Sequence, residues 1–264
     1  MPRRVLVTGG AKRLGALICR HFAAAGWEVW CHYQSSAQAA HALCAELNRQ
    51  GLTAFPIQAD IANESQCQSL FKTINDTVGT VHCLVNNAST FEPDSAGDLE
   101  METAWRHLEV NLLAPLFLSS LMAQTISTEA VAGEHSIIHI LDQKVFNLNP
   151  DYFSYTVSKL ALERAVALQA QALAPRLRVC AVAPGLVFQS GPQSPANFEH
   201  ACTINLMRQA TDPEQIAATC RFLAENPCIT GVTIAVDNGQ HLLPLPRDVM
   251  YLVEDLLKAP SHDT

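Results

Sequence analysis

The sequence predicts an α/β protein in which helices cover both faces of a parallel sheet. Short apolar runs rich in β-branched residues alternate with longer segments of helical period along most of the 264 residues. The first apolar run leads directly into a glycine-rich turn, and 48% of the residues are hydrophobic, enough to bury one sizeable core. These observations favour a single domain over residues 1–264.

Seven apolar segments have the length and composition of buried strands. They are residues 4–8, 28–33, 53–59, 81–86, 136–141, 177–183 and 232–236. Helices are expected between them, near residues 12–25, 36–50, 63–78, 101–130, 152–174 and 212–226. Because strands and helices alternate, the strands should be parallel, and a ligand site is expected at their carboxyl ends.

Two stretches fall outside this alternation. Residues 187–200 (VFQSGPQSPANFEH) are rich in Pro, Ser, Gln and Gly, so a mobile loop over the site is expected, within a substrate loop of about 187–210. The C-terminal tail, residues 245–264, has a weak helical period in DVMYLVEDLL and ends in the exposed-looking APSHDT.

The composition narrows the classes of partner. The chain has 17 Lys and Arg against 25 Asp and Glu, so it has no basic field for a nucleic-acid backbone. No secretory apolar region follows MPRR, and no apolar stretch approaches the roughly 20 residues that span a bilayer. We therefore expect a cytoplasmic protein with a small-molecule substrate and with no nucleic-acid or membrane partner.

The cysteines and histidines do not predict a metal site. The nine cysteines are scattered without a CxxC motif, which predicts reduced thiols packed as small hydrophobic residues. The neighbouring His and Cys residues at 31–32 and 82–83 lie on predicted strands, where adjacent side chains point to opposite faces. His139, inside the run SIIHIL, is expected to be a buried strand histidine with its hydrogen bonds satisfied.

The segment TGGAKRLG (8–15) follows the first strand and opens a helix. Gly9 and Gly10 allow a tight turn, Gly15 allows close helix packing, and the free N–H groups of the helix start can hold a pyrophosphate. Arg13 stands where a third glycine often stands, so a cation is expected beside the phosphates. This pattern indicates a Rossmann-type dinucleotide site in a doubly wound sheet.

The end of the second strand indicates which nicotinamide cofactor binds. The segment CHYQSS (31–36) contains no Asp or Glu, the residue types that would bind the ribose 2′-hydroxyl and repel a 2′-phosphate. Lys12 and Arg13 supply positive charge, and the expected donors are His32, Tyr33, Ser35 and Ser36. NADP(H) is therefore favoured over NAD(H). Further contacts are expected from Asp60 and Ile61 after the third strand and from NNAS (86–89) after the fourth.

Tyr155 and Lys159 are four residues apart on a predicted helix, so they share one face. An ammonium near a phenol favours the ionised phenol, which suits a general acid or base. Together with TGGAKRLG, NNAS, Asn111 and PGL (184–186), this pair resembles the short-chain dehydrogenase/reductase family over nearly the whole chain.

The resemblance implies a nicotinamide cofactor and a homotetramer or homodimer. It implies that Tyr155 donates a proton, that Lys159 binds the nicotinamide ribose and lowers the tyrosine pKa, and that Asn111 supports a water relay. With the residues above, the expected cofactor contacts are Gly9, Lys12, Arg13, Leu14, Gly15, His32, Tyr33, Ser35, Ser36, Asp60, Ile61, Asn87, Ala88, Ser89, Tyr155, Lys159, Pro184 and Gly185.

Asp142 departs from the usual pattern of this family. Its carbonyl reductases usually carry a serine thirteen residues before the tyrosine, and a carboxylate there would repel a developing alkoxide. The chain instead resembles the pteridine reductase branch, which carries an Asp at this place, in the segments TGGAKRLG, CHYQSS, QADIAN (58–63) and NNASTF (86–91). That resemblance implies hydride transfer from NADPH to a C=N bond of a dihydropterin, such as dihydromonapterin or dihydrobiopterin.

The same resemblance implies the substrate contacts. Phe91 would stack on the pterin, Ser89 and Arg13 would make polar contacts to it, and Asp142 with Tyr155 would deliver the proton. In the competing interpretations Phe91 is a core aromatic residue and Asp142 caps a loop. Gln143, Lys144 and the segment FNLNP (146–150) place a cation and a proline near this site.

Two other functions remain open at this point. One is a carbonyl reductase with the same fold and cofactor, acting on a sugar, an acyl chain or another small molecule. The other is a non-catalytic NADP(H)-binding regulatory protein, which the intact Tyr155 and Lys159 disfavour.

Overall fold

The computed structural model describes residues 2–191 and 193–258. Seven parallel strands form one sheet in the order β3-β2-β1-β4-β5-β6-β7. The topology is the predicted Rossmann-type doubly wound sheet. The strands are β1 Arg4–Val7, β2 Glu28–Tyr33, β3 Ala54–Gln58, β4 Cys83–Asn86, β5 His135–Ile140, β6 Leu177–Pro184 and β7 Thr233–Val236.

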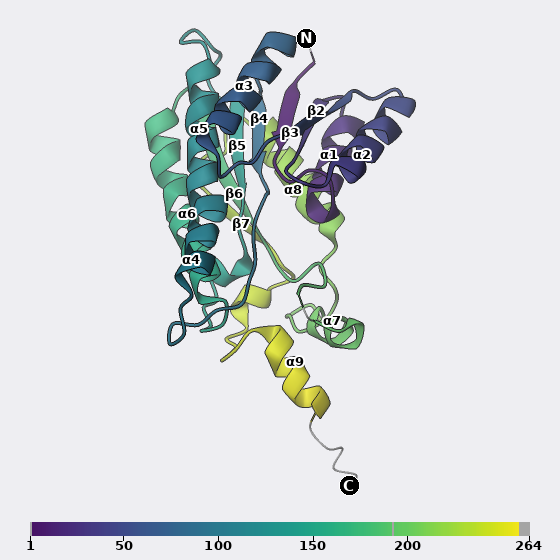
Figure 1. Ribbon diagram of the computed structural model, residues 1–264, viewed down its shortest axis with the longest axis vertical. Helices are drawn as coiled ribbons and strands as arrows, with labels where there is room; N and C mark the ends of the chain where they lie inside the picture. Colours follow the sequence, from purple (N-terminus) through teal and green to yellow (C-terminus); the bar gives the residue numbers. More distant parts are fainter. Residues whose placement is uncertain (1, 192, 259–264) are drawn as a thin grey trace.

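Helices cover both faces of this sheet (Figure 1). One core lies between the sheet and α1 (Arg13–Ala24), α2 (Ala37–Arg49) and α8 (Pro213–Glu225). The other core lies between the sheet and α3 (Glu64–Val78), α5 (Ala114–Thr125) and α6 (Phe153–Leu173). Strands with helices on both faces have no solvent-facing side, which explains why β1 and β4 are buried throughout and consist almost entirely of apolar residues.

The single helix predicted over residues 101–130 is wrong. The structure has α4 (Met101–Leu108), a π-helical turn η1 (Glu109–Leu113) and then α5, which ends at Thr125. Pro115 has no N–H to donate to the carbonyl of Asn111 four residues earlier, so a regular α-helix is interrupted at this point. The wider turn carries Asn111, which is fully buried.

Two helices lie beyond the carboxyl ends of the strands, α7 (Pro195–Ala201) and α9 (Val249–Lys258) (Figure 1). The irregular loop predicted over 187–200 is therefore wrong for its last part. Ser194 accepts a hydrogen bond from the Asn197 N–H and Pro195 occupies the first turn, which is a helix start. The weak helical period of the tail is confirmed by α9, and the predicted exposed end, 259–264, lies outside the described residues.

Three further sequence-based expectations concern buried and apolar residues. His139 is fully buried between Asn86 and Gln169, with ring nitrogens 3.2 and 2.8 Å from their side-chain amides, as predicted. All nine cysteines are free thiols, and every one except Cys228 is buried. Within residues 2–191 and 193–258, no helix combines the length and the apolar character needed to cross a membrane.

Candidate active site

A cavity of about 980 Å³ opens at the carboxyl ends of the strands. It spans the point between β1 and β4 where the strand order reverses, the place where doubly wound sheets bind ligands. All the residues predicted to contact cofactor or substrate line this cavity. Asn111 is the one predicted site residue that does not.

The glycine turn after β1 has no room for a side chain at Gly15, where the start of the helix lies against the backbone of Gly9. Gly9 has a φ of +61°, and a Cβ atom on Gly15 would lie 2.2 Å from the Gly9 carbonyl oxygen. Helix α1 begins immediately afterwards, so its free N–H groups lie at the cavity. This turn can accept a pyrophosphate.

Neighbouring strands brace the turn. The Asn87 side-chain amide donates to the carbonyls of Thr8 and Gly9 at 2.9 and 3.2 Å. The Thr8 hydroxyl oxygen accepts from the Asn87 and Ala88 N–H groups at 2.9 and 3.0 Å. Both sets of bonds tie β1 to β4 at the switch point.

His32 supports the same turn rather than the cofactor. Its Nδ1 accepts from the Gly9 N–H at 3.1 Å, and its Nε2 lies 3.0 Å from the Ala59 carbonyl, to which it can donate. Burial lowers the pKa of His32 to about 4, so the ring is neutral at pH 7. No ring N–H is left for a 2′-phosphate, and the predicted donor role of His32 is wrong for this geometry. Tyr33, Ser35 and Ser36 line the cavity nearby.

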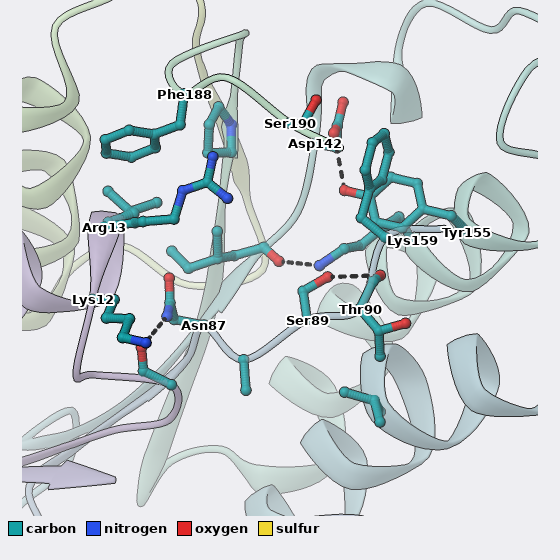
Figure 2. Close-up of a pocket in the computed structure, with 18 of the residues that line it drawn as sticks. Lys12, Arg13, Asn87, Ser89, Thr90, Asp142, Tyr155, Lys159, Phe188 and Ser190 are labelled. Carbon is teal, nitrogen blue, oxygen red and sulfur yellow. Dashed lines mark hydrogen bonds between the residues drawn. The ribbon is translucent and has the colours of Figure 1, made fainter. Parts of the chain in front are cut away.

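Asp142 and Tyr155 meet at the substrate end of the cavity. The Tyr155 hydroxyl donates to Asp142 Oδ2 at 2.9 Å, as Figure 2 shows. Asp142 Oδ1 accepts from the Lys144 backbone N–H, also at 2.9 Å, and so caps the short helix η2 (Gln143–Val145). Both interpretations of Asp142 are therefore correct: Oδ2 belongs to an acid at the cavity, and Oδ1 caps the loop.

Burial dominates the protonation of this pair. It raises the pKa of the Asp142 carboxyl, against the opposing charge of Lys144. Burial and the nearby Asp142 charge raise the pKa of Tyr155 well above its ordinary value. The predicted lowering of the Tyr155 pKa by Lys159 is therefore wrong in this structure, and the phenol keeps its proton at neutral pH.

Lys159 lies one helical turn from Tyr155 on α6 and is buried. Its ammonium donates to the Ile140 carbonyl at 2.8 Å and is 5.8 Å from the centre of the Tyr155 ring. Burial lowers the pKa of Lys159 to about 8, against the charge of Asp142. The side chain is thus held by the end of β5 beside the phenol (Figure 2).

Asn111 does not line the cavity, but it makes hydrogen bonds to the segment at Ser89 and Thr90 that does. Its Oδ1 accepts from the Thr90 N–H at 2.8 Å and from the Ser89 hydroxyl at 3.1 Å. Its Nδ2 donates to the Thr90 carbonyl at 3.0 Å and to the Ser158 hydroxyl at 3.2 Å. Asn111 therefore positions the segment that presents Ser89 and Phe91 to the cavity.

Phe91 is both a packed residue and a cavity residue. Its ring stacks on Tyr152 with centroids 4.0 Å apart, and meets Tyr155 edge-on at 4.6 Å. The same ring lines the cavity beside Asp142. A flat ligand at the phenol would therefore lie against an aromatic wall.

Several cavity residues were not predicted from the sequence. The Arg13 guanidinium lies 5.2 Å from the centre of the Phe188 ring and donates to the Gln189 carbonyl, so it crosses from the glycine turn to the segment after β6 (Figure 2). Val187, Phe188 and Gln193 belong to the loop that was expected over the site, whereas Gln240, Asp248, Val249 and Met250 of the C-terminal part were not predicted. These residues carry no local motif, because they reach the site only through the fold.

Comparison with known proteins agrees with this architecture. The family model described as enoyl-(acyl carrier protein) reductase matches residues 9–241. A 3-oxoacyl-[acyl-carrier-protein] reductase of Synechocystis is 30% identical over 89% of this chain and 95% of its own length. The chain belongs to the short-chain dehydrogenase/reductase family.

Other similar members of the short-chain dehydrogenase/reductase family carry names that refer to pteridines and folates. Pteridine reductase 1 of Leishmania tarentolae is 32% identical over 90% of this chain and 96% of its own length. The crystal structure of FolM alternative dihydrofolate reductase 1 from Brucella suis in complex with NADP superposes with a TM-score of 0.86. It is 39% identical to this short-chain reductase, covering 91% of it and 96% of the Brucella chain.

Proposed function

We propose that this chain is an NADPH-dependent reductase that transfers hydride to a C=N bond of a dihydropterin and forms the tetrahydro product. The observation that carries the proposal is the 2.9 Å hydrogen bond from the Tyr155 hydroxyl to Asp142 in the wall of the cavity. The ring nitrogens and amino group of a pterin can exchange protons with an acid in this place, whereas the ionised form of that acid would oppose the alkoxide that develops in carbonyl reduction. The names of the Leishmania and Brucella relatives support this class of substrate.

The chain is a short-chain reductase that uses NADP(H), and its own residues fit that cofactor. The turn at Gly15 leaves space for no side chain, and α1 begins at it. No acid lies at the end of β2, where Ser35 and Ser36 line the cavity. We assign the pyrophosphate to the start of α1, with Lys12 and Arg13 beside it, and the 2′-phosphate to the end of β2.

When bound, NADPH supplies the hydride. Tyr155 holds the proton for the substrate nitrogen, because its raised pKa keeps the hydroxyl protonated at neutral pH. Asp142 lies within hydrogen-bonding distance of that hydroxyl, and its raised pKa favours the protonated form, which can return a proton to Tyr155. Lys159, held at the Ile140 carbonyl, is placed to bind the nicotinamide ribose.

The substrate ring is assigned to the space beside Phe91. That residue presents an aromatic ring to the cavity and is held by its stacking on Tyr152. We assign the polar contacts to the pterin to Ser89 and Arg13. The Ser89 hydroxyl donates to Asn111, so its oxygen can still accept a hydrogen bond from the substrate. A planar heterocycle uses all three contacts, whereas a flexible acyl chain has no ring to stack.

A second candidate is reduction of a carbonyl. The raised pKa of Asp142 favours a neutral carboxyl, which could donate a hydrogen bond to a carbonyl oxygen. The 3-oxoacyl reductase of Synechocystis is a relative with such a name. Asp142→Ser separates the two functions, since it should raise activity on ketones under this candidate and abolish turnover of pterins under the first.

The deciding experiment follows NADPH consumption with dihydropterins, beside Tyr155→Phe as the blank. Wild type should oxidise NADPH and the variant should not, because phenylalanine has no proton to give. Equal oxidation by the two proteins would show that the assigned site is wrong. Absence of turnover by wild type with both pterins and carbonyls would instead favour a non-catalytic NADP(H)-binding protein.

We also propose that the chain assembles as a homodimer or homotetramer. Apolar side chains are exposed on two neighbouring helices, with Met101 and Trp105 on α4 and Val157 and Leu168 on α6. Large exposed apolar residues of this kind often lie at interfaces between proteins. Light scattering of wild type and of Leu168→Lys tests this, and a monomeric wild type would contradict it.

A further inference from the structure

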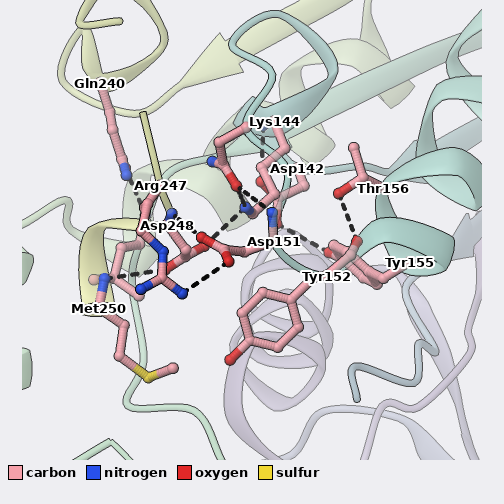
Figure 3. A network of polar contacts seen from close by, with 12 residues as sticks. Asp142, Lys144, Asp151, Tyr152, Tyr155, Thr156, Gln240, Arg247, Asp248 and Met250 are labelled. Carbon is pink, nitrogen blue, oxygen red and sulfur yellow. Dashed lines mark hydrogen bonds and ion pairs between the residues drawn. The ribbon is translucent and has the colours of Figure 1, made fainter. Parts of the chain in front are cut away.

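Lys144 connects the cavity acid to the C-terminal part of the chain. Its backbone N–H donates to Asp142 Oδ1 at 2.9 Å. Its side chain is only 4% exposed, and the ammonium lies 2.8 Å from both Asp248 Oδ2 and Asn149 Oδ1. One residue therefore holds the acid with its main chain and the C-terminal segment with its side chain, as Figure 3 shows.

Asp248 in turn begins the last helix. Its Oδ1 accepts from the Met250 N–H at 3.0 Å, and its own backbone N–H donates to Asp151 Oδ2 at 2.7 Å. Arg247 donates to the other oxygen of Asp151 at 3.1 Å (Figure 3). Through these bonds the start of α9 is attached to the segment between β5 and α6.

The same start of α9 forms part of the cavity wall. Asp248, Val249 and Met250 line the cavity together with Asp142 and Lys144. The Met250 carbonyl also accepts from the Asn197 side chain in α7 at 2.8 Å. A displacement of α9 would therefore move the wall of the cavity.

The charges of the pair act on Asp142 in opposite directions. Burial raises the pKa of Asp142, the Lys144 charge lowers it and the Asp248 charge raises it. The other titratable groups that face this carboxyl are Tyr155 and Lys159 of α6. Removing either member of the pair would leave the other buried without its counter-charge.

We infer that Lys144 and Asp248 are a positioning pair for the reaction: they hold the Asp142 carboxyl at Tyr155 and fix the start of α9 as a wall of the substrate cavity. The C-terminal segment thereby takes part in proton delivery, although none of its residues belongs to the motif of the family. This inference rests on the proposed role of Asp142 in pterin reduction.

The test compares Lys144→Met and Asp248→Asn in the full chain, by the pH dependence of kcat/KM for a dihydropterin. Activity should fall as pH rises through the Asp142 ionisation, because the protonated acid resupplies Tyr155. This alkaline limb should move up in Lys144→Met and down in Asp248→Asn, each by on the order of one pH unit. A merely structural pair would lose activity without opposite movements, and that result would overturn the inference.

A double variant allows the coupling between Lys144 and Asp248 to be measured even if a single variant folds poorly. Lys144→Met with Asp248→Asn leaves no unpaired buried charge and keeps an oxygen for the Met250 N–H, so it should fold better than either single variant. The losses in kcat/KM of the single variants should not add in the double variant, and additive losses would contradict a coupled pair. The exposed pair Lys72 and Asp76 on α3 is the matched control, and its neutralisation should leave the pH profile unchanged.

Hydrogen exchange separates this inference from the proposed function. Lys144→Met should increase exchange of the backbone amides of α9 by tenfold or more, and that measurement needs no substrate. Unchanged exchange in α9 would overturn the positioning role even if pterins are reduced. If wild type reduces no pterin while exchange in α9 increases, the proposed substrate is wrong and the attachment of α9 still holds.

Discussion

The Tyr155 hydroxyl donates a hydrogen bond to Asp142 Oδ2 at 2.9 Å, and the two residues are thirteen positions apart in the chain. The bond joins the end of β5 to the start of α6 at the cavity. Burial raises the pKa of both groups, so the Tyr155 hydroxyl keeps its proton at neutral pH and the protonated form of Asp142 is favoured over its ordinary population. This is the arrangement expected of a proton donor for reduction.

Asp142→Asn tests whether that proton comes from the acid. Asparagine has the same shape: its single side-chain oxygen can still cap the Lys144 N–H, and its amide can donate to the Tyr155 hydroxyl oxygen in place of the present bond, so the fold should be retained. It cannot pass a proton on, and kcat with a dihydropterin should fall by about a hundredfold or more. Steady-state kinetics measure the loss, and NADPH binding by fluorescence should be unchanged; a fully active variant would contradict the role of Asp142.

Asn111→Ala should impair both stability and turnover. The substitution leaves the Thr90 N–H without its partner, which costs about 1–3 kcal/mol in the free energy of unfolding, while the Ser158 hydroxyl keeps its bond to the Tyr155 carbonyl. The segment carrying Ser89 and Phe91 loses its support, so KM for the pterin should rise. Urea unfolding and kinetics check the two effects, and an unchanged KM would show that the segment is held by other contacts.

Arg13→Gly should weaken cofactor binding without weakening the fold. Arg13 has a φ of +50°, which glycine adopts without strain. The free energy of unfolding should therefore stay the same or rise by about 1 kcal/mol. Loss of the guanidinium should raise the Kd for NADPH by about tenfold. Fluorescence titration measures this, with Arg13→Lys as the variant that keeps the charge. Equal Kd values for the glycine variant and wild type would contradict a phosphate contact.

Stability should fall as the pH is lowered from about 6.5 toward 4. Burial lowers the pKa of each of His32, His82 and His139 from 6.5 to about 4. The unfolded chain therefore binds protons in this range that the folded chain does not, which costs at most about 1.4 kcal/mol per pH unit for each histidine. The measurement is urea unfolding at a series of pH values. His139→Gln should make the free energy of unfolding less dependent on pH, whereas substitution of the exposed His200 should leave this dependence unchanged.

Local patterns predicted the parts of the site that local sequence determines. The glycine turn, Tyr155 and Lys159 each depend on residues a few positions apart, and the structure places them at one cavity. The start of α7 could also have been found, since Ser194 and Pro195 are a helix-start signal. The π-turn at Asn111 changes the period by one residue, which a periodic pattern does not register.

The remaining features depend on contacts between distant segments. His32 lies near the end of β2, where a donor to the cofactor was expected, but its ring makes hydrogen bonds to Gly9 and Ala59 on the two neighbouring segments. Lys144 and Asp248 are more than a hundred residues apart, and only the packing of α9 against the end of the sheet brings them together. An ion pair between residues so far apart in the chain produces no periodic pattern in a single sequence, so it could not be predicted from one.

The position of α9 also bears on how the protein should be handled. Its first residues are part of the cavity wall, while the first described residues of the chain lie at the opposite end of the sheet (Figure 1). An affinity tag or fusion partner on the N-terminal side would therefore be remote from the cavity, whereas one joined after α9 would pull on the helix whose first residues form the cavity wall. Purification and immobilisation through the N-terminal end should preserve turnover best.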